Sequence, residues 1–386
     1  MQRDPELSIV MPCLNEQETL AICIKKAQGF LKTHQVVGEI IVADNGSEDG
    51  SQKIAKEQGV RLIIVKDKGY GNALKAGINS AIGKYVIMAD ADNSYNFAAL
   101  MPFLEKLREG SDMVIGNRFK GGIEKGAMPF LHRYLGNPIL SYMGRLFYEV
   151  KIKDFHCGLR GFSKEAFNQM NLRTSGMEFA SEMIVKSRLN NLQITEVPTR
   201  LHRDGRSRKP HLNTWSDGWR HLRFLMLYSP QWLFLIPATI LMVIGSISSF
   251  ILMIKPVVVN GITFDIHTLI YTFSLILIGF QFMVFYALTK IFAVENGLLP
   301  KSKRYNRLFK YINLEKGLVL GFLLLILGII LSFKGLFVWQ DTQFGNLSPS
   351  YSFRIIIPAV FTLLLGIQVI LFSLFFSILG LEKSTN

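Results

Sequence analysis

Cysteine is scarce in this chain of 386 residues, which has only Cys13, Cys23 and Cys157. An odd number without the paired spacing of a zinc site argues against a disulfide framework and is typical of a reducing compartment. The first residues also lack the basic and then apolar pattern of a signal peptide. We therefore expect the first part of the chain to stay in the cytoplasm.

Acidic residues are outnumbered, with 29 Asp and Glu against 43 Lys and Arg, so the formal net charge is +14. This balance predicts an anionic partner: nucleic acid, a membrane surface or a phosphorylated substrate. No zinc-finger or aromatic-interleaved basic pattern supports nucleic acid, and we expect none to bind.

Two glycine motifs that bind phosphates are missing. The chain has neither G-x-G-x-x-G after its first predicted strand nor G-x-x-x-x-G-K-[ST], which argues against a dehydrogenase and a P-loop NTPase. A glycine turn at residues 69–72 remains, and it would let the backbone approach a phosphate or a sugar.

Long apolar runs are absent before residue 229. Four follow, at residues 232–254, 268–288, 318–338 and 355–379. Each has about 20 residues or more, enough to cross the hydrocarbon core of a bilayer. We predict three parts: an α/β domain over residues 1–212, an amphipathic interfacial helix over 213–230, and a transmembrane domain over 231–386.

The loop charges predict an orientation in the membrane. The connection at residues 290–316 carries seven basic residues: Lys290, Lys301, Lys303, Arg304, Arg307, Lys310 and Lys316. The loops at 255–267 and 340–353 together contain only Lys255. The basic connection should be cytoplasmic, which places the first domain and both termini on the cytoplasmic side of the cell membrane.

The first domain alternates strand and helix patterns. Apolar runs of strand type lie at residues 7–14, 39–44, 61–65, 85–89 and 112–116, and residues 194–200 resemble an edge strand. Short connections between strands and helices predict a sheet of mostly parallel strands. We expect Asn15 to cap the helix that follows the first strand, with Glu16 in its first turn.

Two carboxylates follow directly on the buried strand at residues 85–89. Ligands of parallel sheets sit beyond the carboxyl ends of the strands, so Asp90 and Asp92 should line a cleft. Paired carboxylates there suit Mg²⁺ or Mn²⁺, which prefer oxygen ligands and leave places for substrate phosphates. The motif alone leaves a solvated acidic turn equally open.

Several motifs together resemble a known family. Residues 11–16 (Met-Pro-Cys-Leu-Asn-Glu), 44–47 (Asp-Asn-Gly-Ser), 68–73 (Lys-Gly-Tyr-Gly-Asn-Ala) and 90–92 (Asp-Ala-Asp) resemble a family-2 glycosyltransferase of the GT-A fold. Residues 116–119, 133–137 and 154–162 (Asp-Phe-His-Cys-Gly-Leu-Arg-Gly-Phe) narrow the resemblance to the dolichol-phosphate mannose and glucose synthase branch, including bacterial polyprenyl-phosphate glycosyltransferases. The implied fold is a Rossmann-like GT-A domain followed by four transmembrane helices.

The resemblance implies transfer of a sugar from a nucleotide-sugar to a lipid phosphate. A metal ion held by Asp90 and Asp92, with Ser94 as the third ligand, would neutralise the leaving diphosphate. The implied nucleotide-sugar contacts are Pro12, Glu16, Asp44, Gly71, Asp90, Arg206, Ser207 and Arg208. Helix-turn positions are the alternative interpretation of Glu16 and Asp44.

The acceptor phosphate is already an anion and needs cationic positioning more than a strong base. The resemblance assigns this to Arg118, Arg133 and Ser141, where solvated arginines are the alternative. It also implies that Asp154 orients the reacting groups and that Glu182 faces the sugar, whereas an ordinary charged helix face would explain Glu182 and Glu178. Arg160 is predicted to be structural, paired with an acid of its own loop.

The basic loop at residues 203–209 resembles the segment that closes over the nucleotide diphosphate in this family. A basic run so close to the predicted spans could also meet anionic lipid headgroups, and both functions can coexist.

The sequence therefore predicts an inverting, metal-dependent hexosyltransferase that uses UDP-glucose and polyprenyl (undecaprenyl) phosphate. GDP-mannose is the alternative donor, and a homo-oligomer is left open. A processive polysaccharide synthase shares the fold, but the Q-x-x-R-W motif of those enzymes is replaced by Ser-Pro-Gln-Trp at residues 229–232. A non-catalytic membrane scaffold or lipid-sugar transporter is the third interpretation.

Overall fold

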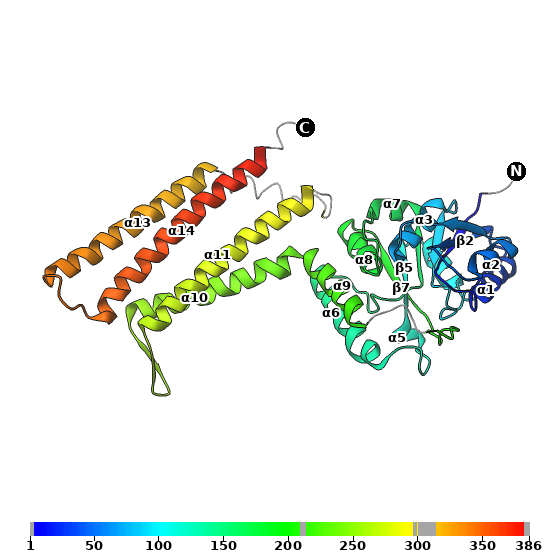
Figure 1. Cartoon of the computed structure of the whole chain (residues 1–386), viewed down its shortest axis with the longest axis horizontal. Coiled ribbons are helices and arrows are strands. Elements are labelled where there is room, and N and C mark those ends of the chain that lie inside the picture. Colours follow the sequence, from blue (N-terminus) through cyan, green and yellow to red (C-terminus); the bar gives the residue numbers. More distant parts are fainter. Residues whose placement is uncertain (1–3, 209–213, 296–298, 300–313, 382–386) are drawn as a thin grey trace. The chain divides into compact units, whose positions relative to one another are not determined.

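The computed structural model describes residues 4–208, 214–295, 299 and 314–381. The chain divides into two compact units, Met1–Leu227 and Tyr228–Asn386. Each unit is described by itself, with the element labels of Figure 1.

A seven-stranded sheet forms the centre of the first unit, in the order β3-β2-β1-β4-β6-β5-β7. The strands are β1 (Leu7–Cys13), β2 (Gly38–Asp44), β3 (Arg61–Ile64), β4 (Tyr85–Met88), β5 (Met113–Asn117), β6 (Arg160–Ser163) and β7 (Ile194–Pro198). All pairs are parallel except those of β6, which runs antiparallel to β4 and β5. The mostly parallel sheet and the edge position of β7 are as predicted. Strand β6 was not predicted, because its residues lack a long apolar run.

Helices connect the strands. They are α1 (Leu20–Thr33), α2 (Ser51–Glu57), α3 (Tyr70–Ser80), α4 (Met101–Arg108), α5 (Arg118–Gly121), a π-helical turn η1 (His132–Gly136), α6 (Asn137–Tyr148), α7 (Lys164–Met170), α8 (Phe179–Leu189) and α9 (Thr214–Leu227). The helix predicted for residues 213–230 is thus present as α9.

Asn15 does not cap α1, and that expectation is wrong. The helix begins five residues later, at Leu20, while Asn15 adopts a positive φ of 57°. The Asn15 side-chain oxygen accepts a hydrogen bond from the Glu48 amide at 2.8 Å. Asn15 therefore joins the turn after β1 to the turn after β2.

Strand register brings the ends of the central strands together. Cys13 of β1 pairs with Asp44 of β2, and Val10 of β1 pairs with Met88 of β4. Because the three strands are parallel, their carboxyl ends meet at one edge of the sheet. The segments after β1, β2 and β4, which carry the predicted acidic motifs, leave the sheet from this edge.

The second unit is helical apart from a small hairpin. It contains a π-helical turn η2 (Gln231–Leu235), α10 (Ile236–Ile254), the strands β8 (Val257–Val259) and β9 (Ile262–Phe264), α11 (Ile266–Glu295), α13 (Leu314–Asp341) and α14 (Pro349–Leu381). Four of its helical segments are long and apolar enough to cross a membrane. The four predicted spans fall within them, whereas the hairpin was not predicted.

Small residues let the long helices approach closely. A Cβ added at Gly321 of α13 would come within 3.0 Å of the Gly366 carbonyl oxygen of α14, and one added at Gly245 of α10 would come within 2.7 Å of the Thr272 carbonyl oxygen of α11. Arg354 of α14 pairs with Asp265 at the start of α11. Close backbone packing thus joins the two helices within each hairpin, and the Arg354–Asp265 ion pair connects one hairpin to the other.

The basic residues that set the predicted orientation are mostly outside the described ranges. They are Lys301, Lys303, Arg304, Arg307 and Lys310. Lys209, the last residue of the predicted basic loop, also lies outside the described ranges. The orientation in the membrane stays a prediction.

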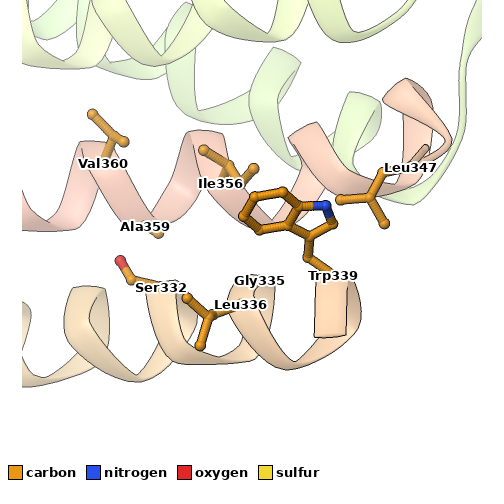
Figure 2. Close-up of a pocket in the computed structure, with 8 residues that line it drawn as sticks. All are labelled: Ser332, Gly335, Leu336, Trp339, Leu347, Ile356, Ala359 and Val360. Atoms are coloured by element: carbon orange, nitrogen blue, oxygen red, sulfur yellow. The ribbon is translucent and has the colours of Figure 1, made fainter. Parts of the chain in front are cut away.

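A cavity of about 320 Å³ lies between α13 and α14. Figure 2 shows the Trp339 indole between Ile356 and Leu347, above the backbone of Gly335. The lining contains no titratable side chain, so this cavity is not a candidate for catalysis.

Alanine substitutions at two helical glycines should have opposite effects on stability. A Cβ at Gly77 of α3 would lie 2.7 Å from the Val10 Cγ1 atom and 3.1 Å from the Ala43 Cβ atom. We expect Gly77→Ala to lower the free energy of unfolding by about 1–3 kcal/mol, because the sheet has no room for the methyl group. Urea denaturation of the detergent-solubilised protein, followed by circular dichroism, measures the change.

Gly29→Ala in α1 is the matched control. No heavy atom lies within 4 Å of a Cβ added at Gly29, so alanine should raise the stability by up to about 1 kcal/mol through its higher helix propensity. Equal effects of the two substitutions would contradict the packing of α3 on β1 and β2.

Candidate active site

Asp44 ends β2 with its carboxylate buried at the edge of the sheet. Its Oδ2 atom accepts hydrogen bonds from the amides of Gly46 and Ser47, both at 3.1 Å, and from the Gln52 side chain at 2.8 Å. Its Oδ1 atom is buried and has no hydrogen-bond partner among the described residues. A buried acceptor of this kind is suited to an N–H donor of a ligand.

Asp90 and Asp92 follow β4, and each has one carboxylate oxygen held by a hydroxyl group. The Tyr70 hydroxyl donates to Asp90 Oδ1 at 2.9 Å. The Ser94 hydroxyl and amide donate to Asp92 Oδ1 at 2.6 and 3.0 Å. Burial, and then the charge of Asp92, raises the pKa of Asp90 to about 6.

The donor set at these two residues fits a hard divalent cation that completes its shell with substrate oxygens. Among the residues that the structure describes, no group of three or more His, Cys, Asp or Glu side chains could hold a metal alone. At Asp92, a cationic group already lies close to the outer oxygen, because Arg206 Nη2 is 3.2 Å from Oδ2. The role of Ser94 as a third metal ligand stays a prediction.

The basic loop folds over the segment that follows β1. Arg206 pairs with both oxygens of Glu16, at 2.7 and 2.9 Å, and Arg208 Nη2 lies 3.1 Å from Glu16 Oε1. The Ser207 amide donates to Glu18 at 2.7 Å. Glu16 lies before α1, so the first-turn interpretation of this residue is wrong.

A small cavity lies where the basic loop contacts the segment after β1. Its volume is about 180 Å³, and it is lined by Asn15, Glu16, Gln17, Glu18, Asp49, Arg206 and Arg208. The structure therefore brings the predicted residues Glu16, Asp92, Arg206 and Arg208 together, although Glu16 and Arg206 are 190 positions apart in the chain.

Pro12 and Gly71 lie near the same edge but are held by the fold. Pro12 is a buried residue of β1, opposite Ala43 of β2. The Gly71 amide donates to the Ser175 carbonyl oxygen at 2.8 Å, and an added Cβ would lie 2.8 Å from the Thr174 carbonyl oxygen. Glycine at position 71 is thus required by the packing of residues 174–175.

Arg118 and Asp154 form a buried ion pair at the end of β5. Arg118 donates through Nε and Nη2 to the two Asp154 oxygens, both at 2.7 Å, and its amide donates to Oδ2 at 3.0 Å. Burial opposes the Arg118 charge, but Tyr95 and Asp154 outweigh it, so that the pKa of Arg118 is raised. The geometry holds Arg118 charged and in one orientation.

Arg133 and Ser141 lie on the neighbouring segment. Arg133 belongs to the π-helical turn η1, and such turns are frequent at functional sites. Its guanidinium lies over the Tyr134 ring, 5.4 Å from the ring centre. Ser141 is buried in α6 and accepts a hydrogen bond from the Phe155 amide at 3.2 Å. Ser141 therefore supports the loop that carries Asp154.

Glu182 differs from its predicted orientation. Its carboxylate is fully buried and accepts hydrogen bonds from the amides of Arg173 and Thr174 and from the Thr174 hydroxyl, at 2.7–3.1 Å. Both oxygens are thus used within the chain, to hold the turn that precedes α8. Contact of Glu182 with the sugar has no support in this geometry.

Arg160 is structural, but its predicted acidic partner is wrong. The fully buried guanidinium donates to the main-chain carbonyl oxygens of Phe155, Cys157 and Ala180. It therefore joins the Asp154 loop to the start of α8 through backbone groups.

Comparison with known proteins identifies the family. Residues 8–170 match the model of glycosyl transferase family 2, and residues 287–380 match the family-2 C-terminal transmembrane region. The low-salt glycan biosynthesis hexosyltransferase Agl6 of Haloferax volcanii is 37% identical over 381 residues, which cover 97% of this chain and 89% of that protein. The chain is a family-2 glycosyltransferase.

Two further similar proteins match about half of the chain. Human dolichyl-phosphate beta-glucosyltransferase is 30% identical over 219 residues, which cover 50% of this chain and 66% of that protein. Glucosyl-3-phosphoglycerate synthase of Mycobacterium tuberculosis has a similar fold, with 18% identity, a TM-score of 0.47, and coverage of 57% of this chain and 79% of that one. The seven-stranded, mostly parallel sheet and the family-2 match agree with the predicted GT-A domain. The transmembrane region that follows makes this glycosyltransferase a membrane protein.

Two histidines were not predicted: His221 of α9, which is buried, and His156, which is partly exposed but has both ring nitrogens buried. The His156 and His221 rings meet edge to face, with centres 4.6 Å apart, and Ser181 Oγ lies 2.9 Å from His221 Nδ1. Neither ring nitrogen of His156 has a hydrogen-bond partner within the described part of the chain. Their only signal in the sequence was the position of His156 two residues after Asp154.

These two histidines should make the glycosyltransferase sensitive to acid. Burial lowers the pKa of His221 to about 4, and burial and then His221 lower the pKa of His156. The unfolded state takes up these protons near its ordinary pKa of about 6.5, before the folded state does. Stability should therefore fall as the pH drops from about 6.5 towards 4, by up to about 3 kcal/mol for His221.

His221→Gln tests this expectation, because glutamine does not titrate. The melting temperature of the variant should fall less on acidification than that of the unmodified enzyme, as measured by differential scanning fluorimetry across this pH range. Parallel curves for the two proteins would contradict a neutral buried His221.

Proposed function

We propose that this glycosyltransferase moves a hexose from a nucleotide-sugar to a polyprenyl phosphate and forms a polyprenyl-phosphate monosaccharide. The observation that carries the proposal is the position of the arginines of the basic loop against Glu16 and Asp92. This arrangement gives cationic groups directly beside two carboxylates that would bind a metal ion, as a nucleotide diphosphate requires.

The donor would bind at the carboxyl edge of β1, β2 and β4. The free Oδ1 atom of Asp44 would accept an N–H group of the base, and Arg206 and Arg208 would exchange part of their contacts with Glu16 for diphosphate oxygens. Asp90 and Asp92 would hold Mg²⁺ or Mn²⁺, which stabilises the negative charge of the leaving diphosphate. We favour UDP-glucose as the donor, with GDP-mannose as the alternative.

The acceptor phosphate would bind at Arg118 and Arg133, with Ser141 holding the adjoining loop. A phosphate oxygen is already nucleophilic, and it would attack the anomeric carbon from the face opposite the diphosphate, with inversion. Both Asp154 oxygens are engaged by Arg118, so Asp154 would orient the arginine rather than act as a general base.

Exposed aromatic side chains support a membrane-facing acceptor site. On the segment that carries Arg133, Phe130 and Tyr134 are 73% and 60% exposed, and Trp215 of α9 is 79% exposed. Aromatic side chains are typical of the interface between membrane and water. We propose that this surface meets the cytoplasmic leaflet, where the lipid phosphate would reach Arg118 and Arg133.

The names of the relatives favour this function over its alternatives. The human relative is a dolichyl-phosphate beta-glucosyltransferase, and Agl6 is a hexosyltransferase of glycan biosynthesis. A processive synthase would release a long polymer, and a scaffold would turn over no donor. The mass of the lipid product distinguishes all three.

Asp92→Asn should abolish transfer, because the amide removes the charge that would hold the metal and the leaving diphosphate. We expect at least a 100-fold loss, as an order of magnitude. The purified enzyme is incubated with Mn²⁺, undecaprenyl phosphate and one donor: UDP-glucose, UDP-N-acetylglucosamine or GDP-mannose. The mass of the extracted lipid is then measured by mass spectrometry. One added hexose is the expected product.

Arg133→Ala should raise the KM for the lipid phosphate by about 10- to 100-fold, since it removes a charged hydrogen-bond donor. Arg61→Ala is the matched control: Arg61 lies on β3 and pairs with Glu39, so the KM should not change. A polymer, full activity of Asp92→Asn, or no turnover of any donor would overturn the proposed function.

A further inference from the structure

Tyr70 links the glycine turn before α3 to the metal-binding motif. It is the first residue of α3, and its hydroxyl donates to Asp90 Oδ1 at 2.9 Å. The contact repeats at Asp90 the arrangement found at Asp92, where the Ser94 hydroxyl donates to Oδ1. In each carboxylate, Oδ1 is thus held by a hydroxyl group, while Oδ2 has no hydroxyl donor among the residues that the structure describes.

The other oxygen of Asp90 lies against a backbone without a side chain. A Cβ added at Gly158 would lie 2.6 Å from Asp90 Oδ2. The Gly158 amide is itself fixed, because it donates to the Tyr95 hydroxyl at 2.9 Å. Asp90 therefore sits between a hydrogen-bond donor on one side and a close backbone on the other.

We propose that Tyr70 is a positioning residue that fixes the Asp90 carboxylate for binding of a divalent cation and a nucleoside diphosphate. This inference rests on the proposed function, which places the cation at Asp90 and Asp92. The terminal torsion of aspartate is broad and has few intrinsic constraints. A hydroxyl donor to an ionised carboxylate is a strong hydrogen bond and holds one rotation of the group.

Tyr70 is in turn held by the segment before α8. Gly69 has a φ of 135°, which few other residues adopt, and the amides of Gly71 and Asn72 donate to the Ser175 carbonyl oxygen at 2.8 and 3.3 Å. The glycine turn is therefore fastened to Ser175 by the two residues that directly follow Tyr70.

Glu182 fixes the same segment from the other side. Its carboxylate accepts the amides of Arg173 and Thr174, directly before Ser175. A continuous set of hydrogen bonds thus leads from Glu182 through residues 173–175 and Gly71 to Tyr70 and Asp90. Glu182 would act on metal binding through this set and without touching the sugar.

Tyr70→Phe tests the inference, because it removes one hydroxyl and keeps the ring. We expect the affinity for Mn²⁺ in the presence of UDP, and separately of GDP, to fall by about 10- to 100-fold, as for other groups that orient a metal ligand. Electron paramagnetic resonance of free Mn²⁺, with the full chain in detergent, measures it. Activity should return towards that of the unmodified enzyme when Mn²⁺ is raised, and the melting temperature should stay unchanged.

Tyr85→Phe is the matched control. Tyr85 begins β4, about 16 Å along the strand from Asp90, and its loss of a hydroxyl should leave the affinity for Mn²⁺ unchanged. Glu182→Gln should weaken Mn²⁺ binding in the same direction as Tyr70→Phe. If both act by one route, the double variant should bind Mn²⁺ about as weakly as Tyr70→Phe alone.

The outcomes separate the two proposals. If the unmodified enzyme binds no Mn²⁺ with either nucleotide, the metal site of the proposed function and this inference both fail. If it binds Mn²⁺ and Tyr70→Phe binds it equally well, this inference alone is overturned. If the losses of Mn²⁺ affinity add in the double variant, the proposed connection from Glu182 is overturned, while the positioning role of Tyr70 still stands.

Discussion

Negative charge gathered at one edge of a sheet is the constraint on which the catalytic unit depends. Parallel pairing of β1, β2 and β4 places Glu16, Asp44, Asp90 and Asp92 around the same edge. Carboxylates so close together repel each other, and burial makes the repulsion stronger because the local dielectric is low. The neighbouring groups all act to offset this charge: the backbone amides at Asp44, the hydroxyl groups of Tyr70 and Ser94, and the guanidinium groups of the basic loop.

The same constraint explains the contacts of the basic loop. Arg206 and Arg208 lie against Glu16 in the structure, so the acidic edge already has cationic partners. A nucleotide diphosphate with its metal would replace some of these contacts with others of the same kind. The Arg118–Asp154 pair differs, because it is buried and bidentate. Such a pair is costly to break, and it holds the Arg118 guanidinium in one orientation.

Local patterns in the sequence were enough to predict most strands, the four apolar helices and the clustering of acidic residues at strand ends. They were not enough for β6, whose four residues pair antiparallel between two strands that are distant in the chain. They also assigned Asn15 to a helix cap and Glu182 to the sugar. Those two side chains instead bind backbone amides of Glu48 and of residues 173–174. A polar side chain has several partners of equal chemistry, and the sequence does not say which of them is near.

The sequence by itself determined the class of this glycosyltransferase, since apolar periodicity, run length and motif spacing are properties of adjacent residues. Tertiary structure decided which atom of each functional group is free. Glu16 meets Arg206 across 190 positions, Tyr70 of α3 reaches Asp90 after β4, and His156 meets His221 of α9. These contacts depend on the register of the sheet and on the packing of helices against it. The orientation of a carboxylate is therefore a property of the folded chain, whereas its presence at a strand end is already evident in the sequence.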